Sequence, residues 1–560
     1  MIKGPIKLFK LNLFKLFIVT LGTTLLLSIS SISPIQAQVF THQQTVIEFL
    51  DRMAQKGAIE FNDLIKPVDR ATVFSLLKNL QDNKNLSKIE KAEVQFYLSY
   101  YSFDNLEKSY TPKSISVFKQ FKKSLFNEPH ILNYSDDHFR FMVDPVAEIQ
   151  FQSSQKTSQL ISTGLQVMGY AGKHIGFQLS VRDVNETGDY DSIRMDNTLG
   201  GFNRKQSTSN KLLSYSQMNA NLSYRFKKGM ISIGQDQHVL GYGKTGSLVL
   251  SAKAPAYPYF KFQYEPTKWM SINYMHAWLQ SGVIDSTKTY GTGNSVYGGQ
   301  REVFVPKFYA IHFIELKPMK GLSIHIGESI VYTDQLEPAY LIPLTFFKAY
   351  DNNKFDDKIT TGANGQFFIG VSSRNQIPKT HLYAQLLIDE IRLSNVFDAT
   401  NSRNQIAYQL GASITDFGLP YLTLTAEINK VYPFVYRNFL PAQNYTNSNF
   451  SLGDWMGSNA DRFELIANYH PKPRLNLKAY YRIMSKGGPG SIEQQYFLTP
   501  SPVYGFDPQY KTRQLSAEIS YELYNNVQFK INYTNYQMHP LLRNINTSNQ
   551  LNIGAVFSPY

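Results

Sequence analysis

From about Val143 to the end of the chain, apolar and polar residues alternate one by one. Between Tyr421 and Tyr432, Leu422, Leu424, Ala426 and Ile428 are separated by Thr423, Thr425, Glu427 and Asn429. Successive side chains of a β-strand point to opposite faces, so this alternation predicts strands with one apolar and one polar face.

The alternation predicts about 18 strands in all. Their approximate limits are 143–152, 164–170, 174–182, 214–226, 229–237, 259–265, 270–281, 307–317, 322–332, 365–373, 380–392, 405–415, 421–432, 462–469, 474–485, 513–523, 527–537 and 549–557. The stretches 270–281 and 307–317 alternate poorly, and without them the pattern would predict two strands fewer.

The connections between these strands are alternately short and long throughout the chain. Residues 227–228, for example, form a short connection, and 282–306 form a long one. Short periplasmic turns and long extracellular loops are typical of outer-membrane barrels. A β-sandwich has no reason for this rhythm, and a propeller would show a repeated motif that we do not find. The fold we predict is a transmembrane antiparallel β-barrel over residues 138–560, with its apolar positions facing lipid and its polar positions facing the lumen.

Before the barrel, the periodicity changes to that of helices. Residues 41–105 predict three short amphipathic helices, the first at about Gln43–Lys56. Asp69 is the expected N-cap of the second helix, and Ser87 with Glu90 has the spacing of a capping box for the third. We expect residues 38–105 to form a small periplasmic helical bundle that packs against something larger. Residues 106–137 are polar and are expected to be a linker.

The first 37 residues have the composition of an export signal. Four lysines lie within the first 15 residues, an apolar run starts at Leu16, and small and polar residues end at Ala37. We therefore expect a signal peptide at 1–37 and a mature protein in the outer membrane of a Gram-negative cell. Its removal would lower the formal charge from +13 to +9.

Composition and motifs exclude several kinds of chemistry. The chain has no Cys, which rules out disulfides, thiolate metal sites and Cys nucleophiles. It also lacks a G-x-S-x-G nucleophile motif and an H-E-x-x-H zinc motif. We therefore expect no catalytic residue, no metal and no cofactor, and a protein that is not an enzyme.

The polar positions of the predicted strands include charged residues that should face the lumen. They are Arg182, Arg225, Glu427, Lys478, Arg482, Glu518 and Lys530. One interpretation is a selectivity lining in an open channel. The other, which we favour, is an internal network of ion pairs that fills the barrel, because long loops can fold inward.

The long connections are rich in aromatic and basic residues. Aromatic rings stack on sugar faces, and cationic groups pair with uronate or phosphate, so a positively charged exported chain fits an anionic glycan or lipopolysaccharide. Our candidate ligand contacts are Tyr242, Arg301, Arg437 and Trp455. The alternative for each is an ordinary structural role in a loop or in the aromatic girdle at the membrane interface.

Several segments of the chain match the motifs of a known family. The clearest is 234–251, GQDQHVLGYGKTGSLVLS, followed by FIELKP at 313–318, GES at 327–329, LEPAYLIPL at 336–344 and LLIDE at 386–390. In this order, the segments resemble the Wzi-type capsule assembly family. FLDR at 49–52, Gly57 and IKPVDR at 65–70 resemble the helical segment of the gliding-bacterium branch. The chain departs from the family pattern at Leu240, where relatives carry a Trp, so any glycan contact by that Trp is in doubt here.

The resemblance implies an 18-stranded outer-membrane barrel that binds surface polysaccharide, for capsule assembly and attachment or for gliding motility. The implied partners are capsular or exopolysaccharide or lipopolysaccharide, outer-membrane lipid, and a periplasmic or motility protein at the helical bundle, with no nucleic acid. A diffusion porin is the first alternative, and it requires an open lumen. An outer-membrane hydrolase is the second, and the sequence offers no strong candidate for its catalytic residue.

Overall fold

The fold is taken from a computed structural model of the chain. It describes residues 38–105, 132–154, 157–188, 200–203, 207–209, 212–293, 296, 298–354, 362–390, 404–496, 502–524, 527–540 and 546–557. The expected signal peptide and most of the expected linker lie outside the described residues.

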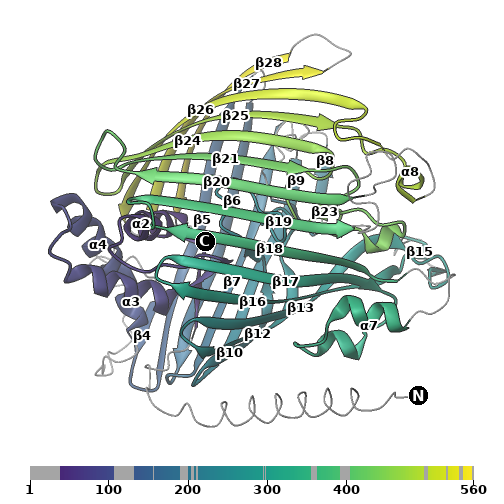
Figure 1. The fold of residues 1–560 in the computed structure, drawn as a ribbon, viewed down its shortest axis with the longest axis horizontal. Helices are drawn as coiled ribbons and strands as arrows, with labels where there is room; N and C mark the ends of the chain where they lie inside the picture. The colour runs from purple at the N-terminus through teal and green to yellow at the C-terminus, as the bar shows by residue number, and fades with distance from the viewer. Residues whose placement is uncertain are drawn as a thin grey trace, which may run out of the picture.

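Within the described chain, 18 long antiparallel strands form one closed barrel (Figure 1). They are β5 (Phe139–Ser153), β6 (Thr157–Ala171), β7 (Ile175–Thr187), β9 (Leu212–Phe226), β10 (Gly229–Asp236), β12 (Tyr257–Thr267), β13 (Met270–Ile284), β16 (Phe304–Met319), β17 (Leu322–Thr333), β18 (Asn364–Arg374), β19 (Thr380–Glu390), β20 (Gln405–Thr415), β21 (Leu422–Val431), β24 (Ala460–Lys472), β25 (Leu475–Gly487), β26 (Pro508–Tyr524), β27 (Val527–Pro540) and β28 (Asn546–Phe557). The barrel closes where β28 pairs with β5. Each predicted strand is present, and the predicted barrel is confirmed.

The two faces of each strand differ as the alternation predicts. On β21, the side chain of Ile428 points outward and is 43% exposed, whereas that of Glu427 points inward and is 1% exposed. The same holds around the wall, where outward leucine, isoleucine and tyrosine side chains form an apolar belt. Such a belt on a closed barrel suits contact with lipid, because closure leaves the sheet without a free edge.

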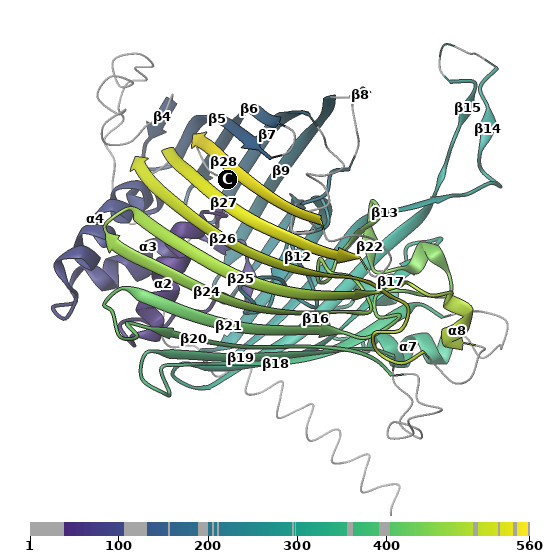
Figure 2. The same cartoon turned by 90° about the horizontal axis from the view of Figure 1, so that it is seen from above.

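The helical segment, residues 38–105, lies at the end of the barrel that carries the short turns (Figures 1 and 2). Its helices are α2 (Gln44–Gln55), α3 (Arg70–Gln81) and α4 (Lys88–Tyr101). Asp69 caps α3 by accepting from Thr72 N, and Ser87 and Glu90 form the capping box of α4. Both predicted caps are therefore confirmed. No helix in the described part of the chain is both long and apolar enough to cross a membrane.

Polar contacts join the helical segment to the barrel wall. Glu522, near the end of β26, accepts hydrogen bonds from Gln43, Thr45 and Tyr97 at 2.8–3.2 Å. Lys56, just after α2, lies 3.0 Å from Asp416 in the turn that follows β20. In outer-membrane barrels short turns face the periplasm, so we expect the mouth that holds the helical segment to be the periplasmic one.

A short strand precedes the barrel wall. Leu132–Ser135, which the sequence placed within the linker, forms β4 and pairs with β5. The barrel sheet therefore begins a few residues earlier than the alternation of polar and apolar residues alone indicates.

Candidate functional site in the barrel lumen

Two long connections enter the lumen instead of remaining outside it. The first, residues 237–256 between β10 and β12, is called here the first inward loop. The second, residues 432–459 between β21 and β24, is the second inward loop. Both loops contribute to one buried hydrophobic cluster, in which they pack against inward side chains of the wall. The loop residues of this cluster include Leu248, Val249 and Tyr445, none of which is exposed. The lumen is therefore filled by the chain's own loops.

The first inward loop extends down the lumen until it meets the helical segment. Its strand β11 (Val239–Leu240) pairs with β2 (Ile65–Lys66) of that segment. Beyond β11, Lys66 Nζ donates to the carbonyl oxygen of Gly241 at 3.1 Å. Most of the 234–251 stretch that resembles the capsule family lies in this loop. That stretch therefore makes the contact between the first inward loop and the helical segment.

Two glycines allow this loop to pack. A Cβ at Gly243 would lie 2.1 Å from the carbonyl oxygen of Gly246, and one at Gly246 would lie 2.6 Å from a carboxylate oxygen of Asp454. Neither position has space for a side chain, which gives a steric reason for glycine at both.

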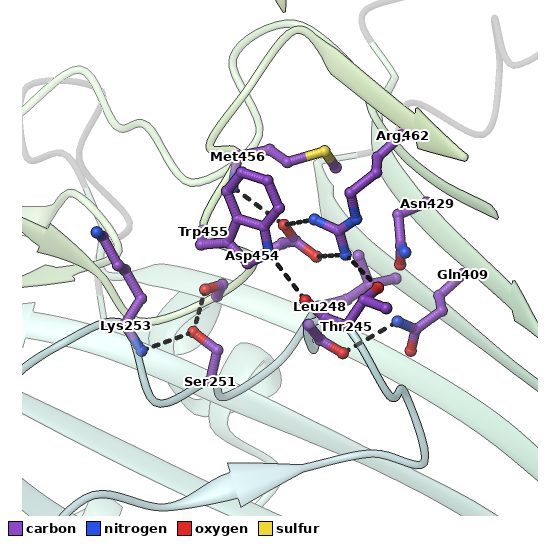
Figure 3. A network of polar contacts seen from close by, with 12 residues as sticks. Thr245, Leu248, Ser251, Lys253, Gln409, Asn429, Asp454, Trp455, Met456 and Arg462 are labelled. Atoms are coloured by element: carbon purple, nitrogen blue, oxygen red, sulfur yellow. Dashed lines mark hydrogen bonds and ion pairs between the residues drawn. The ribbon is translucent and has the colours of Figure 1, made fainter. Parts of the chain in front are cut away.

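A polar network joins the two inward loops to the wall (Figure 3). Arg462 on β24 is fully buried and lies 3.1 Å from Asp454 in the second loop. Trp455 Nε1 donates to the carbonyl oxygen of Thr245 in the first loop at 2.8 Å. The guanidinium groups of Arg462 and Arg482 lie 4.5 and 4.9 Å from the Trp455 ring centroid. A buried network with this many paired groups fixes the relative position of both loops.

A second ionic cluster connects the tip of the first inward loop, the helical segment and the wall. Lys244 Nζ lies 2.9 Å from a carboxylate oxygen of Asp51 on α2. Arg374 at the end of β18 lies 3.0 Å from Asp51 and also contacts Asp63. Burial raises the pKa of Asp63, but Lys66, Arg374 and Lys244 outweigh burial and hold that pKa well below its usual range. Both carboxylates are therefore ionised and held by cations from other segments.

A cavity of about 430 Å³ lies between the first inward loop, α2 and strands β20, β21, β24 and β25. Its lining combines acids and bases, including Glu48, Asp51, Lys66, Lys253 and Lys478, with Trp455. Charged side chains therefore line the chamber together with apolar surface.

Two of the predicted lumen-facing charges of the wall, Glu427 and Arg482, take part in these contacts. Glu427 accepts from Lys244 N at 2.8 Å and from the Tyr383 hydroxyl at 2.6 Å. Arg482 donates to Glu464 at 2.9 Å. For Glu427 and Arg482, the interpretation as paired filling of the barrel is the one that the contacts support.

The four candidate ligand contacts from the sequence do not gather at one place. Tyr242 is 2% exposed, and its hydroxyl contacts Asn62 and Ser323 near the periplasmic end. Trp455 lies in the network between the inward loops. Arg437 is half-buried and donates to Gly490 O at 3.1 Å, and Arg301 is exposed on a projecting hairpin. Their role in binding a ligand remains a prediction, although the burial of Tyr242 argues against direct contact with a surface glycan.

Asp51, Asp63 and Arg374 could not be recognised as a cluster from the sequence. Arg374 lies on the barrel wall, more than 300 residues from the two aspartates of the helical segment, so no local motif joins them. Within the described residues, no group of three or more His, Asp or Glu side chains could hold a metal ion.

Solved structures with a similar fold include outer-membrane proteins. Wzi of Escherichia coli, an outer-membrane protein involved in group 1 capsule assembly and described as a carbohydrate-binding β-barrel, aligns with a TM-score of 0.56 at 12% identity. The alignment covers 93% of this chain and 99% of Wzi. OccD3 of Pseudomonas aeruginosa aligns with a TM-score of 0.41 at 14% identity, over 74% of this chain and 90% of its own.

Another similar structure is OccAB2 of Acinetobacter baumannii, with a TM-score of 0.42 at 12% identity, over 74% of this chain and 97% of its own. No curated protein matches the sequence. The sequence profile of one family, described as capsule assembly protein Wzi, matches residues 144–550, which is nearly the whole barrel. This chain therefore belongs to the Wzi capsule assembly family.

Proposed function

We propose that this protein binds capsular polysaccharide at the cell surface and helps to attach it to the outer membrane. The observation that carries the proposal is the family match over residues 144–550, joined to the barrel fold. Like the family, the chain would act as a binding protein and not as an enzyme. The comparisons give no support to a gliding role, so capsule attachment is the function we propose.

The filled lumen argues against the diffusion porin. Two inward loops and the helical segment occupy the space through which solutes would pass, and their side chains form the largest buried hydrophobic cluster of the described residues. Polysaccharide binding therefore belongs to the outer surface of the long-loop end.

A projecting hairpin at that end offers suitable chemistry. It consists of β14 (Tyr290–Gly291) and β15 (Gln300–Arg301), and it extends well beyond the barrel rim (Figure 2). Tyr290 and Arg301 are direct cross-strand partners, so their side chains lie on the same face, and both are exposed. The Tyr290 ring could stack on a sugar while the Arg301 guanidinium pairs with a uronate carboxylate or a phosphate. Repeated units of one polysaccharide would bind several copies of the protein and so gain avidity.

The test is binding of the purified, detergent-solubilised protein to capsular polysaccharide from its own host, with neutral dextran as the inert control. We expect saturable binding that weakens as salt increases, because the contacts are partly ionic. Tyr290→Ala and Arg301→Ala should each lower the affinity. Lys288→Ala is the matched control, because Lys288 is exposed on the same hairpin and pairs locally with Asp285 at 3.0 Å. Absence of binding at every salt concentration would refute the proposal.

A further inference from the structure

One long connection folds over the outside of the barrel wall. Residues 334–354, between β17 and β18, are called here the outer-wall loop. They contain a 3-10 turn at Pro338–Leu341 and helix α7 (Phe347–Lys354). Tyr340 and Phe347 of this loop pack in one buried cluster with Tyr274, Ala310 and Ile330 of the wall.

Those wall residues point away from the lumen. On β16, Tyr309 and Ile311 belong to the buried hydrophobic cluster in the lumen. Ala310, which lies between them, and His312, the next residue along, therefore face outward. On β17, Val331 faces the lumen and Ile330 faces outward by the same alternation. The outer-wall loop therefore covers the lipid-facing side of β13, β16 and β17.

The loop covers polar groups that could not face lipid alone. Glu328, an outward residue of β17, accepts from Phe347 N at 2.6 Å and lies 3.2 Å from His312 on β16. An ionisable side chain exposed on the lipid side of a barrel is costly. The loop thus satisfies Glu328 with backbone donors at the first turn of α7.

The opposite side of the loop is apolar and exposed. Ile342, Leu344 and Phe346 are 55%, 75% and 56% exposed. Leu336 and Leu341 are exposed as well, which makes five large apolar side chains within 11 consecutive positions. A surface of this kind is unfavourable in water and usually marks contact with membrane or protein.

The apolar surface of the loop is continuous with the lipid-facing wall. The ring of Phe346 lies 5.9 Å from that of Phe367, an outward residue of β18 whose strand partner on β17 is Glu328. The next outward row consists of Ile314, Ile326 and Ile369, which are strand partners of one another and exposed.

The height of the contact also fits the membrane. Glu328 is the seventh residue of β17. Six steps of about 3.3 Å, on a strand tilted by about 40°, place it roughly 15 Å above the periplasmic turn. This lies within an apolar band about 25 Å tall.

From this geometry we propose that the outer-wall loop is inserted into the outer leaflet of the membrane, where the acyl chains cover Ile342, Leu344 and Phe346. The connection is then a lipid-contacting element of the barrel and not a free extracellular loop. The inference does not depend on polysaccharide binding.

Because the sequence has no cysteine, a thiol-reactive label attaches only to a cysteine that is introduced. Single variants Leu344→Cys and Ile342→Cys would carry an environment-sensitive fluorophore in the full chain, reconstituted in phospholipid vesicles. Ile326→Cys, on the lipid-facing wall, is the acyl-chain reference. Lys288→Cys, on the projecting hairpin, is the aqueous reference. Heat-modifiable migration on gels would confirm that each labelled barrel is folded.

Lipids brominated on their acyl chains should quench the labels at 344 and 342 as strongly as the label at 326, and aqueous iodide should have little effect on them. The label at 288 should show the reverse. Strong iodide quenching at 344 and 342 would overturn the proposal by placing the loop in water. Protection from both quenchers would also overturn it, by showing that a second copy or another protein covers the loop.

Discussion

At the scale of single residues, buried ion pairs hold the helical segment to the barrel. Asp51 and Asp63 come from the helical segment, Lys244 from the first inward loop and Arg374 from the wall. Removing one member of such a cluster leaves an uncompensated buried charge, which is more damaging than the net contribution of the pair suggests. These residues are therefore among those that hold the helical segment in the mouth.

Arg374→Ala should detach the helical segment from the barrel. It leaves both carboxylates with too few partners, and we expect a loss of about 3–5 kcal/mol in the docking free energy. Limited proteolysis of the helical segment in the folded barrel would measure the change. Lys320→Ala is the matched control, because Lys320 forms a highly exposed pair with Glu60 and its loss should have almost no effect.

Docking should also weaken in acid. Burial raises the pKa values of Glu90, within the helical segment, and of Asp416, on the barrel. Hydrogen bonds, including those from Lys56, outweigh burial and lower both pKa values below the usual 4.5 and 3.8. Only the pair of Lys56 with Asp416 joins the segment to the barrel. Acids with lowered pKa values stabilise the folded state above their usual pKa values and lose this effect as the pH falls through the folded values. The same proteolysis assay at decreasing pH should show loosening below these usual values. In Lys56→Met the increase in proteolysis on acidification should be smaller than in the unaltered protein. An unchanged pH profile would show that the Lys56 pairs are not the source of the acid sensitivity.

At the scale of elements, the structure shows which parts of the fold could be predicted from local patterns. Most of the long barrel strands and both helix caps follow from alternation and capping chemistry, which act between neighbours in sequence. The strands at 270–281 and 307–317 alternate poorly because both of their faces are buried. Met275 and Ile311 face the filled lumen, and Tyr274 and Ala310 are covered by the outer-wall loop.

The inward course of the two loops could not be predicted in the same way. It depends on contacts between distant segments, such as Lys244 with Asp51 and Trp455 with Thr245. For the same reason, the sequence placed Tyr242 among surface candidates although its ring lies deep in the barrel.

The attachment of the outer-wall loop can be tested at Glu328. Glu328→Ala would leave the backbone N–H groups of Phe347 and Lys348 without their acceptor, at a cost of about 1–3 kcal/mol. We expect faster tryptic cleavage after Lys348 in vesicle-embedded protein. Asn352→Ala, on the exposed side of α7, is the control and should leave cleavage unchanged. Equal cleavage rates in the two variants would show that Glu328 does not hold the loop.

At the scale of the whole molecule, the barrel has the size of a channel but is closed. An 18-stranded barrel without its contents would enclose a water-filled lumen. Here the inward loops occupy the lumen, and the first of them reaches the helical segment at the mouth with the short turns.

The closed lumen predicts negligible steady conductance in a planar lipid bilayer. Replacing residues 241–249 by a short glycine linker should produce stable open channels, because this removes the centre of the first inward loop. Deleting the hairpin between residues 287 and 301 is the control, since that hairpin lies outside the barrel and its loss should leave the conductance low. Large steady conductance in the unaltered protein would support the porin alternative.

The seam between β28 and β5 has a consequence for biogenesis. It joins the last long strand of the wall to the first, and it encloses a loop that is bonded to the N-terminal helical segment. A finished cylinder offers no lateral entrance for the inward loops, and placing them before the seam forms avoids threading them through an end of the barrel. The protein is therefore expected to enter the membrane as a filled body, and the insertion machinery has to hold open a gap large enough for a folded interior.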